Sequence, residues 1–273
     1  MSDLIRRTYT GIIFVIIIFT GTIINPLLFA IIFAGILFFV LKEFYEMAKN
    51  SGASPQKIPG IILGILLFLL MFLKNSQFAP ENIIWLIIPL VFSIFIIELF
   101  RNKEKPLTNI ALTLAGIFLT ALPFSLLNFF VFTNFQGQQQ FYPWLLMGIF
   151  FILWSYDTGA YLFGMKFGKF KLFERISPKK SWEGVIGGAI VAMIVGILNS
   201  VVFHSVSLSG WIGIALIIIV FGTFGDLIES MFKRSLNIKD SGNILPGHGG
   251  ILDRLDSFIF SIPFIFAWLM IIS

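Results

Sequence analysis

Residues 83–100 read IIWLIIPLVFSIFIIELF, with Glu98 as the one charged residue among them. An apolar run of this length is typical of a helix that crosses a membrane, because about 20 such residues span the hydrocarbon core. Similar runs fill the 273-residue chain, which is 58% hydrophobic and only 12% charged. A soluble domain of this size carries about twice that charged fraction. The sequence therefore predicts an all-α integral membrane protein.

Nine candidate spans are separated by short polar links. They cover residues 8–24, 27–41, 58–73, 83–100, 107–132, 144–163, 183–204, 211–228 and 257–272. The second and third runs are short for a bilayer, and we expect the second to continue as helix through Lys42 and Glu43. No small-residue cleavage site closes the first run, so we expect a retained span and not a signal peptide. The chain has no cysteine, which excludes disulfides and thiolate metal sites.

Lysine and arginine residues indicate the orientation, since cytoplasmic loops accumulate them. When alternate loops are counted from the N-terminus, one set holds 18 of the 19 basic residues, and the other holds Lys74 alone. We therefore expect a cytoplasmic N-terminus and a C-terminus on the opposite side. The net charge of +5 is explained by this placement, and no nucleic-acid partner is expected.

The two halves of the chain differ in their polar residues. Residues 1–132 form nearly featureless spans, whose polar side chains we interpret as caps and interfacial anchors. We expect this half to be a scaffold that contributes lipid entry or dimer contacts. Residues 133–273 contain two basic cytoplasmic loops and the candidate chemistry. The predicted division is thus an N-terminal transmembrane region and a C-terminal catalytic region.

Four aspartates stand out in the second half. Asp157 lies inside the sixth span, where a carboxylate at membrane depth costs about 2.5–3.5 kcal/mol and needs a partner. A structural polar network would explain it equally well. Asp226 lies near the inner end of the eighth span, and Asp253 and Asp256 lie three apart where the ninth begins, on one helical face. Asp226 alone could be an interfacial carboxylate that reaches water, and helix capping could explain Asp253 and Asp256. Together, however, carboxylates at one membrane face favour a site for a hard divalent cation such as Mg²⁺.

The loops beside these aspartates are cationic and contain a glycine-rich turn. Lysines and arginines in such loops follow the positive-inside rule and meet anionic lipid headgroups. That rule does not predict the turn Pro246-Gly247-His248-Gly249-Gly250. Its glycines allow close backbone approach to a ligand, and backbone N–H groups in such turns bind phosphate. Gly164 to Lys169 has the wrong spacing for a P-loop, and neither a dinucleotide fingerprint nor a zincin helix occurs.

Two segments carry a resemblance to a known family. The run from Ser230 to Asp256, with KR, KD, PGHGG and LDRLD, resembles the signature of phosphatidate cytidylyltransferases, also called CDP-diacylglycerol synthases. The stretch from Asp157 to Gly184, with DTGAY, FGK and ISPKKSWEG, is similar to that family's other shared segment. The resemblance implies cytidylyl transfer from CTP to phosphatidate, which gives CDP-diacylglycerol and pyrophosphate. It also implies Mg²⁺, a second cation (K⁺ or divalent) in a paired-metal site, and a homodimer.

The resemblance suggests roles for individual residues. The predicted metal ligands are Asp226 and Asp253, with Asp256 a third contributor. The predicted catalytic set adds Lys180 and His248, the latter near the leaving pyrophosphate. The predicted substrate-binding set comprises Asp157, Arg175, Ser177, Lys179, Lys233, Arg234, Lys239, Gly247, Gly249, Gly250 and Arg254. We expect the site to face the cytoplasm at the inner membrane of a bacterium, with lipid tails entering laterally.

Other functions remain open from the residues alone. A CTP-dependent lipid kinase of the polyprenol type would use the γ-phosphate, although the PGHGG and ISPKKSWEG segments favour the cytidylyltransferase. A transporter without chemistry would need polar residues through the midplane, where Asp157 is the one candidate. The multi-aspartate motif of CDP-alcohol phosphotransferases is missing from the sequence.

Overall fold

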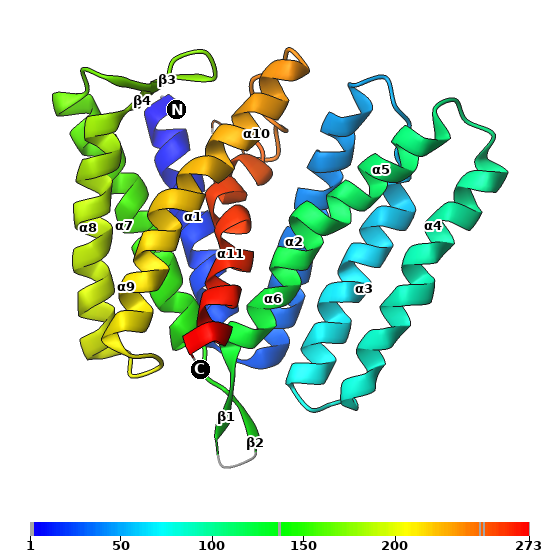
Figure 1. Cartoon of the computed structure of the whole chain (residues 1–273), viewed down its shortest axis with the longest axis horizontal. Helices are drawn as coiled ribbons and strands as arrows, with labels where there is room; N and C mark the ends of the chain where they lie inside the picture. The colour runs from blue at the N-terminus through cyan, green and yellow to red at the C-terminus, as the bar shows by residue number, and fades with distance from the viewer. Residues whose placement is uncertain (1–2, 136–137, 246, 248, 273) are drawn as a thin grey trace. The chain divides into compact units, whose positions relative to one another are not determined.

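The computed structural model describes residues 3–135, 138–245, 247 and 249–272, with only the backbone of residues 3–8, 134, 135 and 138. Within this part of the chain, helices dominate, and eight of them are long and apolar enough to cross a membrane. A ninth helix begins the chain, and its described apolar part is Tyr9–Ile23. Each of the nine predicted spans coincides with one of these helices, which confirms the predicted fold class (Figure 1).

The helices differ from the predicted spans mainly at their ends. Their bounds are α1 (Asp3–Ile23), α2 (Pro26–Lys49), α3 (Lys57–Asn75), η1 (Glu81–Leu86), α4 (Ile87–Arg101), α5 (Pro106–Gly116), η2 (Ile117–Ala121), α6 (Leu122–Val131), α7 (Trp144–Phe167), α8 (Trp182–Val202), α9 (Leu208–Ile217), η3 (Ile218–Gly222), α10 (Thr223–Ser235) and α11 (Leu252–Ile272). Three spans are composite: η1 leads into α4, η2 joins α5 to α6, and η3 joins α9 to α10. The segments η2 and η3 are short π-helical insertions within otherwise α-helical spans.

Two helices extend well beyond their apolar runs. Helix α2 begins after Asn25, whose side chain accepts the Leu28 N–H at 2.8 Å, and Pro26 fits its first turn. It continues through Lys42 and Glu43, as expected, and ends six residues later at Lys49, so its 24 residues are ample for a bilayer. Helix α10 continues to Ser235, and Glu229 and Lys233 form an i,i+4 ion pair in this extension, which stabilises the helix beyond the predicted span end at residue 228.

The described residues form two compact units. The first comprises the chain up to Tyr142 together with Leu236–Leu255, and the second comprises Pro143–Ser235 together with the chain from Asp256 onward. The hairpin β1 (Phe132–Phe135) and β2 (Gln138–Phe141) belongs to the first unit, and the hairpin β3 (Lys171–Phe173) and β4 (Ser177–Ser181) to the second.

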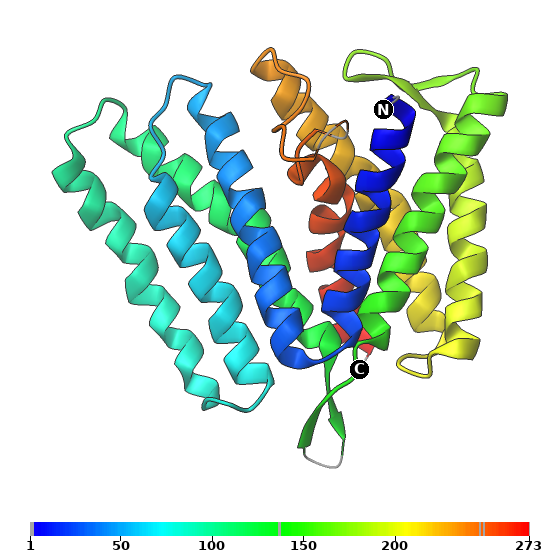
Figure 2. The same ribbon diagram turned by 180° about the vertical axis from the view of Figure 1, so that it is seen from behind.

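The first unit has an apolar core with a buried polar cluster. Helices α2, α3 and α6 lie side by side in both views and pack phenylalanines such as Phe29, Phe33 and Phe68 between them (Figures 1 and 2). Tyr45 of α2 donates its hydroxyl to Thr113 O at 2.8 Å. A Cβ at Gly60 would collide with its ring, so glycine is what lets α3 approach.

Glu98 is the charged member of that polar cluster. Its carboxylate is 5% exposed and accepts hydrogen bonds from Gln56, Asn109 and Arg101, each at 2.7 Å. The one charged residue of the predicted span 83–100 is therefore fully hydrogen-bonded, which offsets the cost of its burial.

The second unit is built on close helix contacts through glycine. Gly159 of α7 faces Gly188 of α8, where an added Cβ would lie 3.0 Å from the Gly188 Cα. The two helices run alongside each other in both views (Figures 1 and 2). Gly225 of α10 sits against α11, since an added Cβ there would lie 2.9 Å from Asp256 O. This small-residue contact places the next residue of α10, Asp226, beside the start of α11.

Candidate functional site

The glycine-rich segment forms a closed turn at the end of the first unit. The Leu245 N–H donates to Gly249 O at 3.0 Å, and these two residues form an isolated antiparallel bridge. Gly247 and Gly249 have φ values of +79° and +84°, a region that side chains with a Cβ rarely adopt. The backbone conformation itself therefore favours glycine at positions 247 and 249, and the predicted approach of the turn to a ligand stays a prediction. Pro246 and His248 lie outside the described residues.

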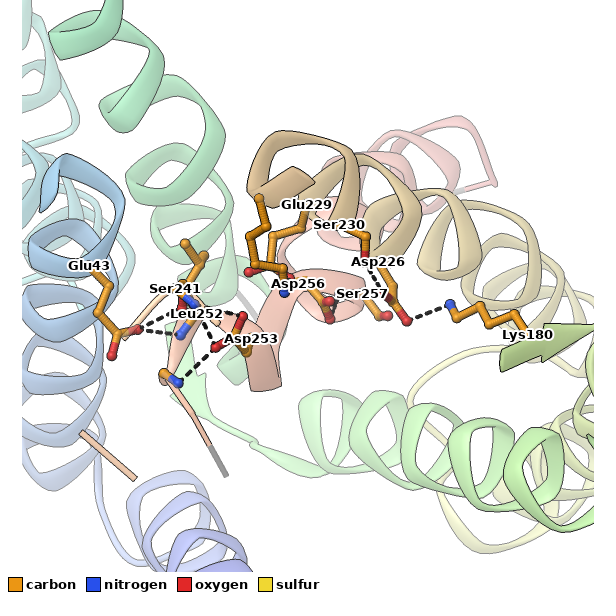
Figure 3. Close-up of polar contacts among 12 residues, drawn as sticks. Glu43, Lys180, Asp226, Glu229, Ser230, Ser241, Leu252, Asp253, Asp256 and Ser257 are labelled. Atoms are coloured by element: carbon orange, nitrogen blue, oxygen red, sulfur yellow. Dashed lines mark hydrogen bonds and ion pairs between the residues drawn. The ribbon is translucent and has the colours of Figure 1, made fainter. Parts of the chain in front are cut away.

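Asp253 is held by that loop. Its Oδ2 accepts the Ser241 N–H at 2.9 Å and the Gly250 N–H at 2.8 Å, and its Oδ1 lies 3.1 Å from the same Ser241 nitrogen (Figure 3). Asp253 lies in the first turn of α11, where a negative charge suits the helix dipole. The carboxylate thus joins both ends of the loop to α11. Its predicted role as a metal ligand stays a prediction.

Asp226 and Lys180 form an ion pair within the second unit. Nζ of Lys180 lies 2.5 Å from Oδ2 of Asp226, and Ser230 donates its hydroxyl to Oδ1 at 3.2 Å (Figure 3). Lys180 comes from β4, whose hairpin leads into α8, and Asp226 comes from α10. Both side chains keep about a third of their surface exposed, at 29% and 32%. The pair joins two residues that are 46 positions apart in the sequence and were both predicted to be catalytic.

Asp256 lies beside Asp226 in the same unit. The two carboxylates interact electrostatically, and Glu229 is within hydrogen-bonding range of Asp256. The Asp256 carboxylate also accepts its neighbour's backbone N–H, from Ser257, at 2.5 Å. Figure 3 shows these acidic side chains on facing turns of α10 and α11. Negative charge is therefore concentrated at Asp226, Glu229 and Asp256. Lys180 compensates part of it through its ion pair with Asp226.

These carboxylates suit a divalent cation in some respects. Asp226 and Asp256 offer the oxygen donors that Mg²⁺ prefers, and a bound cation would relieve their mutual repulsion. Among the described residues, no group of three or more His, Asp and Glu side chains is arranged to hold a metal ion by itself. Because Mg²⁺ usually takes one or two carboxylates and fills its other positions with water and phosphate, a pair of aspartates is sufficient.

The predicted basic residues differ in their surroundings. Lys233 is buried and bonds Glu229 at 3.0 Å, so part of its charge is already compensated. The others are exposed, with Lys180 intermediate, and they come from three places: the β3–β4 hairpin, the end of α10 with the following loop, and the first turn of α11. They are Arg175, Lys179, Lys180, Arg234, Lys239 and Arg254. Their assignment to one substrate or the other stays a prediction.

Two predicted supporting residues lie on separate elements of the second unit. Asp157 is exposed on α7, directly after Tyr156, whose buried hydroxyl hydrogen-bonds Thr223 of α10. Ser177 begins β4, three residues before Lys180. The Tyr156–Thr223 contact connects α7 to α10, the helix that carries Asp226. Asp157 follows Tyr156 directly, so its backbone lies next to this contact.

Glu43 was not among the predicted site residues, yet it contacts the glycine-rich loop. Its Oε2 accepts the Leu252 N–H at 2.8 Å, and the residue is 1% exposed (Figure 3). The interpretation of the polar residues of the first half as caps and anchors does not hold for Glu43, whose carboxylate binds a loop. A signal was present in the sequence: a glutamate that follows the apolar run 27–41 on the same predicted helix, directly after Lys42, needs a partner if it is buried.

Comparison with known proteins places these residues in a family. A family model described as the cytidylyltransferase family matches residues 5–272. A protein named phosphatidate cytidylyltransferase from Staphylococcus aureus (strain COL) is 37% identical over 260 residues, which cover 94% of this chain and 95% of that protein. A protein of the same name from Bacillus subtilis (strain 168) is 33% identical over 284 residues, which cover the full length of both.

Proposed function

The chain belongs to the cytidylyltransferase family, and we propose that it transfers the cytidylyl group of CTP to phosphatidate. The products would be CDP-diacylglycerol and pyrophosphate. The observation that carries the proposal is similarity along nearly the whole chain to relatives with this activity in their names. The Lys180–Asp226 pair is consistent with it, because Lys180 belongs to one segment that bears the family resemblance and Asp226 lies four residues before the other, at Ser230.

The chemistry needs little from a general base. A phosphatidate oxygen attacks the α-phosphorus of CTP, a new P–O bond forms, and the bond to the pyrophosphate oxygen breaks. A phosphomonoester with a second pKa near 6 is mostly ionised at neutral pH, so its oxygen is already a nucleophile. What limits the reaction is repulsion, since two unit charges 4 Å apart interact by about 4 kcal/mol at an effective dielectric of 20. Positioning and charge compensation would supply the catalysis.

The chain's own residues can provide this compensation. Lys180 lies next to Asp226, and the exposed Lys179 and Arg175 lie on the same hairpin. We propose that these cations hold substrate phosphates, and that Asp226 and Asp256, with Asp253, hold Mg²⁺ and a second cation. Mg²⁺, when bound, would offset the negative charge of the phosphates. The glycine turn would contribute backbone N–H groups to the leaving pyrophosphate.

The membrane setting is proposed from the distribution of charge. Eight described helices could cross a membrane, and 18 of the 19 basic residues fall in one set of loops. We propose that this set faces the cytoplasm at the inner membrane of a bacterium, where CTP is available, and that lipid enters laterally. We also propose a homodimer, which the family resemblance implies.

The test is transfer of radiolabel from α-labelled CTP into lipid by the purified protein with phosphatidate and Mg²⁺. We expect label in the organic phase, lost on chelation. A CTP-dependent lipid kinase would transfer label only from γ-labelled CTP. Label from γ-labelled CTP alone would therefore overturn the proposal in favour of the kinase, and no lipid product from either nucleotide would reject both.

A further inference from the structure

Glu43 of α2 is a buried carboxylate with an unusual set of partners. It is 1% exposed, and within the described part of the chain it forms no ion pair. Its Oε1 has no hydrogen-bond partner among the described residues. A buried charge is costly unless it is paired or hydrogen-bonded. The groups that donate hydrogen bonds to Glu43 must therefore account for a glutamate at this buried position.

Glu43 binds the two ends of one loop. Its Oε2 accepts the Leu252 N–H at 2.8 Å, the Ile251 N–H is also directed at the carboxylate, and the Ser241 hydroxyl lies at 3.4 Å. Ser241 opens the segment that contains the glycine turn, and Leu252 closes it where α11 begins. A helix near the start of the chain therefore holds a loop about 200 residues later in the sequence.

Two glycines let the loop backbone reach this carboxylate. A Cβ at Gly242 would lie 2.5 Å from Oε1 of Glu43, and a Cβ at Gly250 would lie 2.6 Å from Oε2. Both distances are far below a van der Waals contact, so a larger residue fits only if the Glu43 side chain or the loop shifts and their contact changes. Glycine at these positions is therefore explained by the approach of Glu43 as well as by the turn itself.

Glu43 and Asp253 bind the same loop residues. Ser241 gives its N–H to Asp253 and its hydroxyl to Glu43, and Gly250 gives its N–H to Asp253 while it packs on Glu43 (Figure 3). Each carboxylate thereby limits the motion of the backbone that the other binds. Loss of Glu43 would free one side of that backbone and with it the orientation of the Asp253 side chain.

We propose that Glu43 is a positioning residue, which fixes the loop from Ser241 to Leu252 and so sets the orientation of Asp253 and the glycine turn. Its effect on turnover rests on the proposed cytidylyl transfer, whereas its effect on the loop does not. What Glu43 contributes to the loop is an acceptor oxygen, which a side chain of this length brings to the Leu252 N–H. Glu43→Gln keeps that oxygen and the side-chain length, and Glu43→Ala removes both.

The first test is hydrogen–deuterium exchange of the full-length protein in lipid nanodiscs without substrate. We expect exchange in peptides that cover residues 241–252 to rise about tenfold in Glu43→Ala and to stay within about threefold of wild type in Glu43→Gln. Exchange in α7 and α8 should not change. Glu46→Ala is the matched control, because Glu46 lies on the same helix and makes an exposed ion pair with Lys57 at 2.7 Å.

The second test is kinetic, on the same samples. A displaced loop should lower kcat of Glu43→Ala by at least about tenfold and raise the Mg²⁺ concentration for half-maximal rate, with Glu43→Gln much nearer wild type.

Unchanged loop exchange in Glu43→Ala, or an equal rise over the whole chain, would overturn the proposal. If that variant does not fold, Gly242→Ala disturbs the same contact from the loop side and must show the same local rise. Should wild type fail to transfer label, the proposed function fails, but the exchange result still decides the role of Glu43.

Discussion

The Lys180 ammonium and the Asp226 carboxylate are 2.5 Å apart, which brings the β3–β4 hairpin onto α10 within one compact unit. Lys180 belongs to one of the two segments that bear the family resemblance, and Asp226 lies four residues before the other, which begins at Ser230. An isolated exposed ion pair contributes little stability, about 0–1 kcal/mol. The pair is therefore better explained by a function in which a cation and a carboxylate are needed together.

Lys180→Ala should reduce kcat/KM by about 100-fold, because removal of one preorganised charge that stabilises a transition state has this order of effect. Folding should be preserved, as the side chain is partly exposed. The measurement is label transfer by purified protein, with thermal unfolding as a check. Lys166→Ala is the control, since Lys166 is exposed and contacts the ring of its neighbour Phe167. Equal losses in the two variants would remove the special role of Lys180.

Asp253→Asn should abolish turnover and leave the protein inserted and folded. The amide keeps one oxygen to accept the Gly250 or Ser241 N–H, but it loses the charge that the proposed metal requires. Label transfer measured over a range of Mg²⁺ concentrations tests this. Substantial Mg²⁺-dependent activity in the variant would exclude Asp253 as a metal ligand and leave it a role in loop structure only.

Gly249→Ala should impair activity more than Gly35→Ala does. Gly249 has φ +84°, which costs an alanine roughly 1–2 kcal/mol, and an added Cβ would lie 2.9 Å from Oδ2 of Asp253. An added Cβ at Gly35 of α2 meets nothing within 4 Å. Turnover and Mg²⁺ dependence would be compared for the two variants. Wild-type kinetics for Gly249→Ala would show that the turn tolerates a shift.

Much of the fold followed from the sequence because membrane helices are specified by composition. Runs such as residues 83–100 are long enough to identify spans without any knowledge of their neighbours. The helix ends were harder to predict, as α10 shows. Its last two turns contain the polar pair Glu229–Lys233, and a search for apolar runs does not detect such a helix extension.

The site was only partly predictable, for a related reason. Asp226, Asp253 and Asp256 could be selected because charges are rare in this chain. The different surroundings of these aspartates could not be predicted: Asp253 accepts hydrogen bonds from loop N–H groups, while Asp256 faces other carboxylates. The need of Glu43 for a partner could be inferred from its place after an apolar run, but its partners Ser241 and Leu252 could not, because they lie about 200 residues away and such pairings leave no local pattern in a single sequence.

Glu98→Ala should destabilise the first unit by about 3 kcal/mol, as expected when one partner of a buried charged network is removed. Gln56 and Asn109 would each lose an acceptor in an environment with little water. Thermal unfolding in detergent, followed by far-UV circular dichroism, would measure the loss. Glu46→Ala breaks an exposed pair and should shift the midpoint far less. Similar shifts for both variants would contradict the structural importance of the buried network.

The orientation of the chain can be tested cleanly because it has no cysteine. A single cysteine at Gln140, in the β1–β2 hairpin, should react with a membrane-impermeant thiol reagent in intact cells. A cysteine at Lys103, in the link between α4 and α5, should react only after the membrane is permeabilised. These two links fall in opposite sets of loops when the spans are counted, and only the set with Lys103 is rich in basic residues. The reverse labelling pattern would place the carboxylates and the glycine turn on the outer face, away from cytoplasmic CTP, and would overturn the proposed setting together with the orientation.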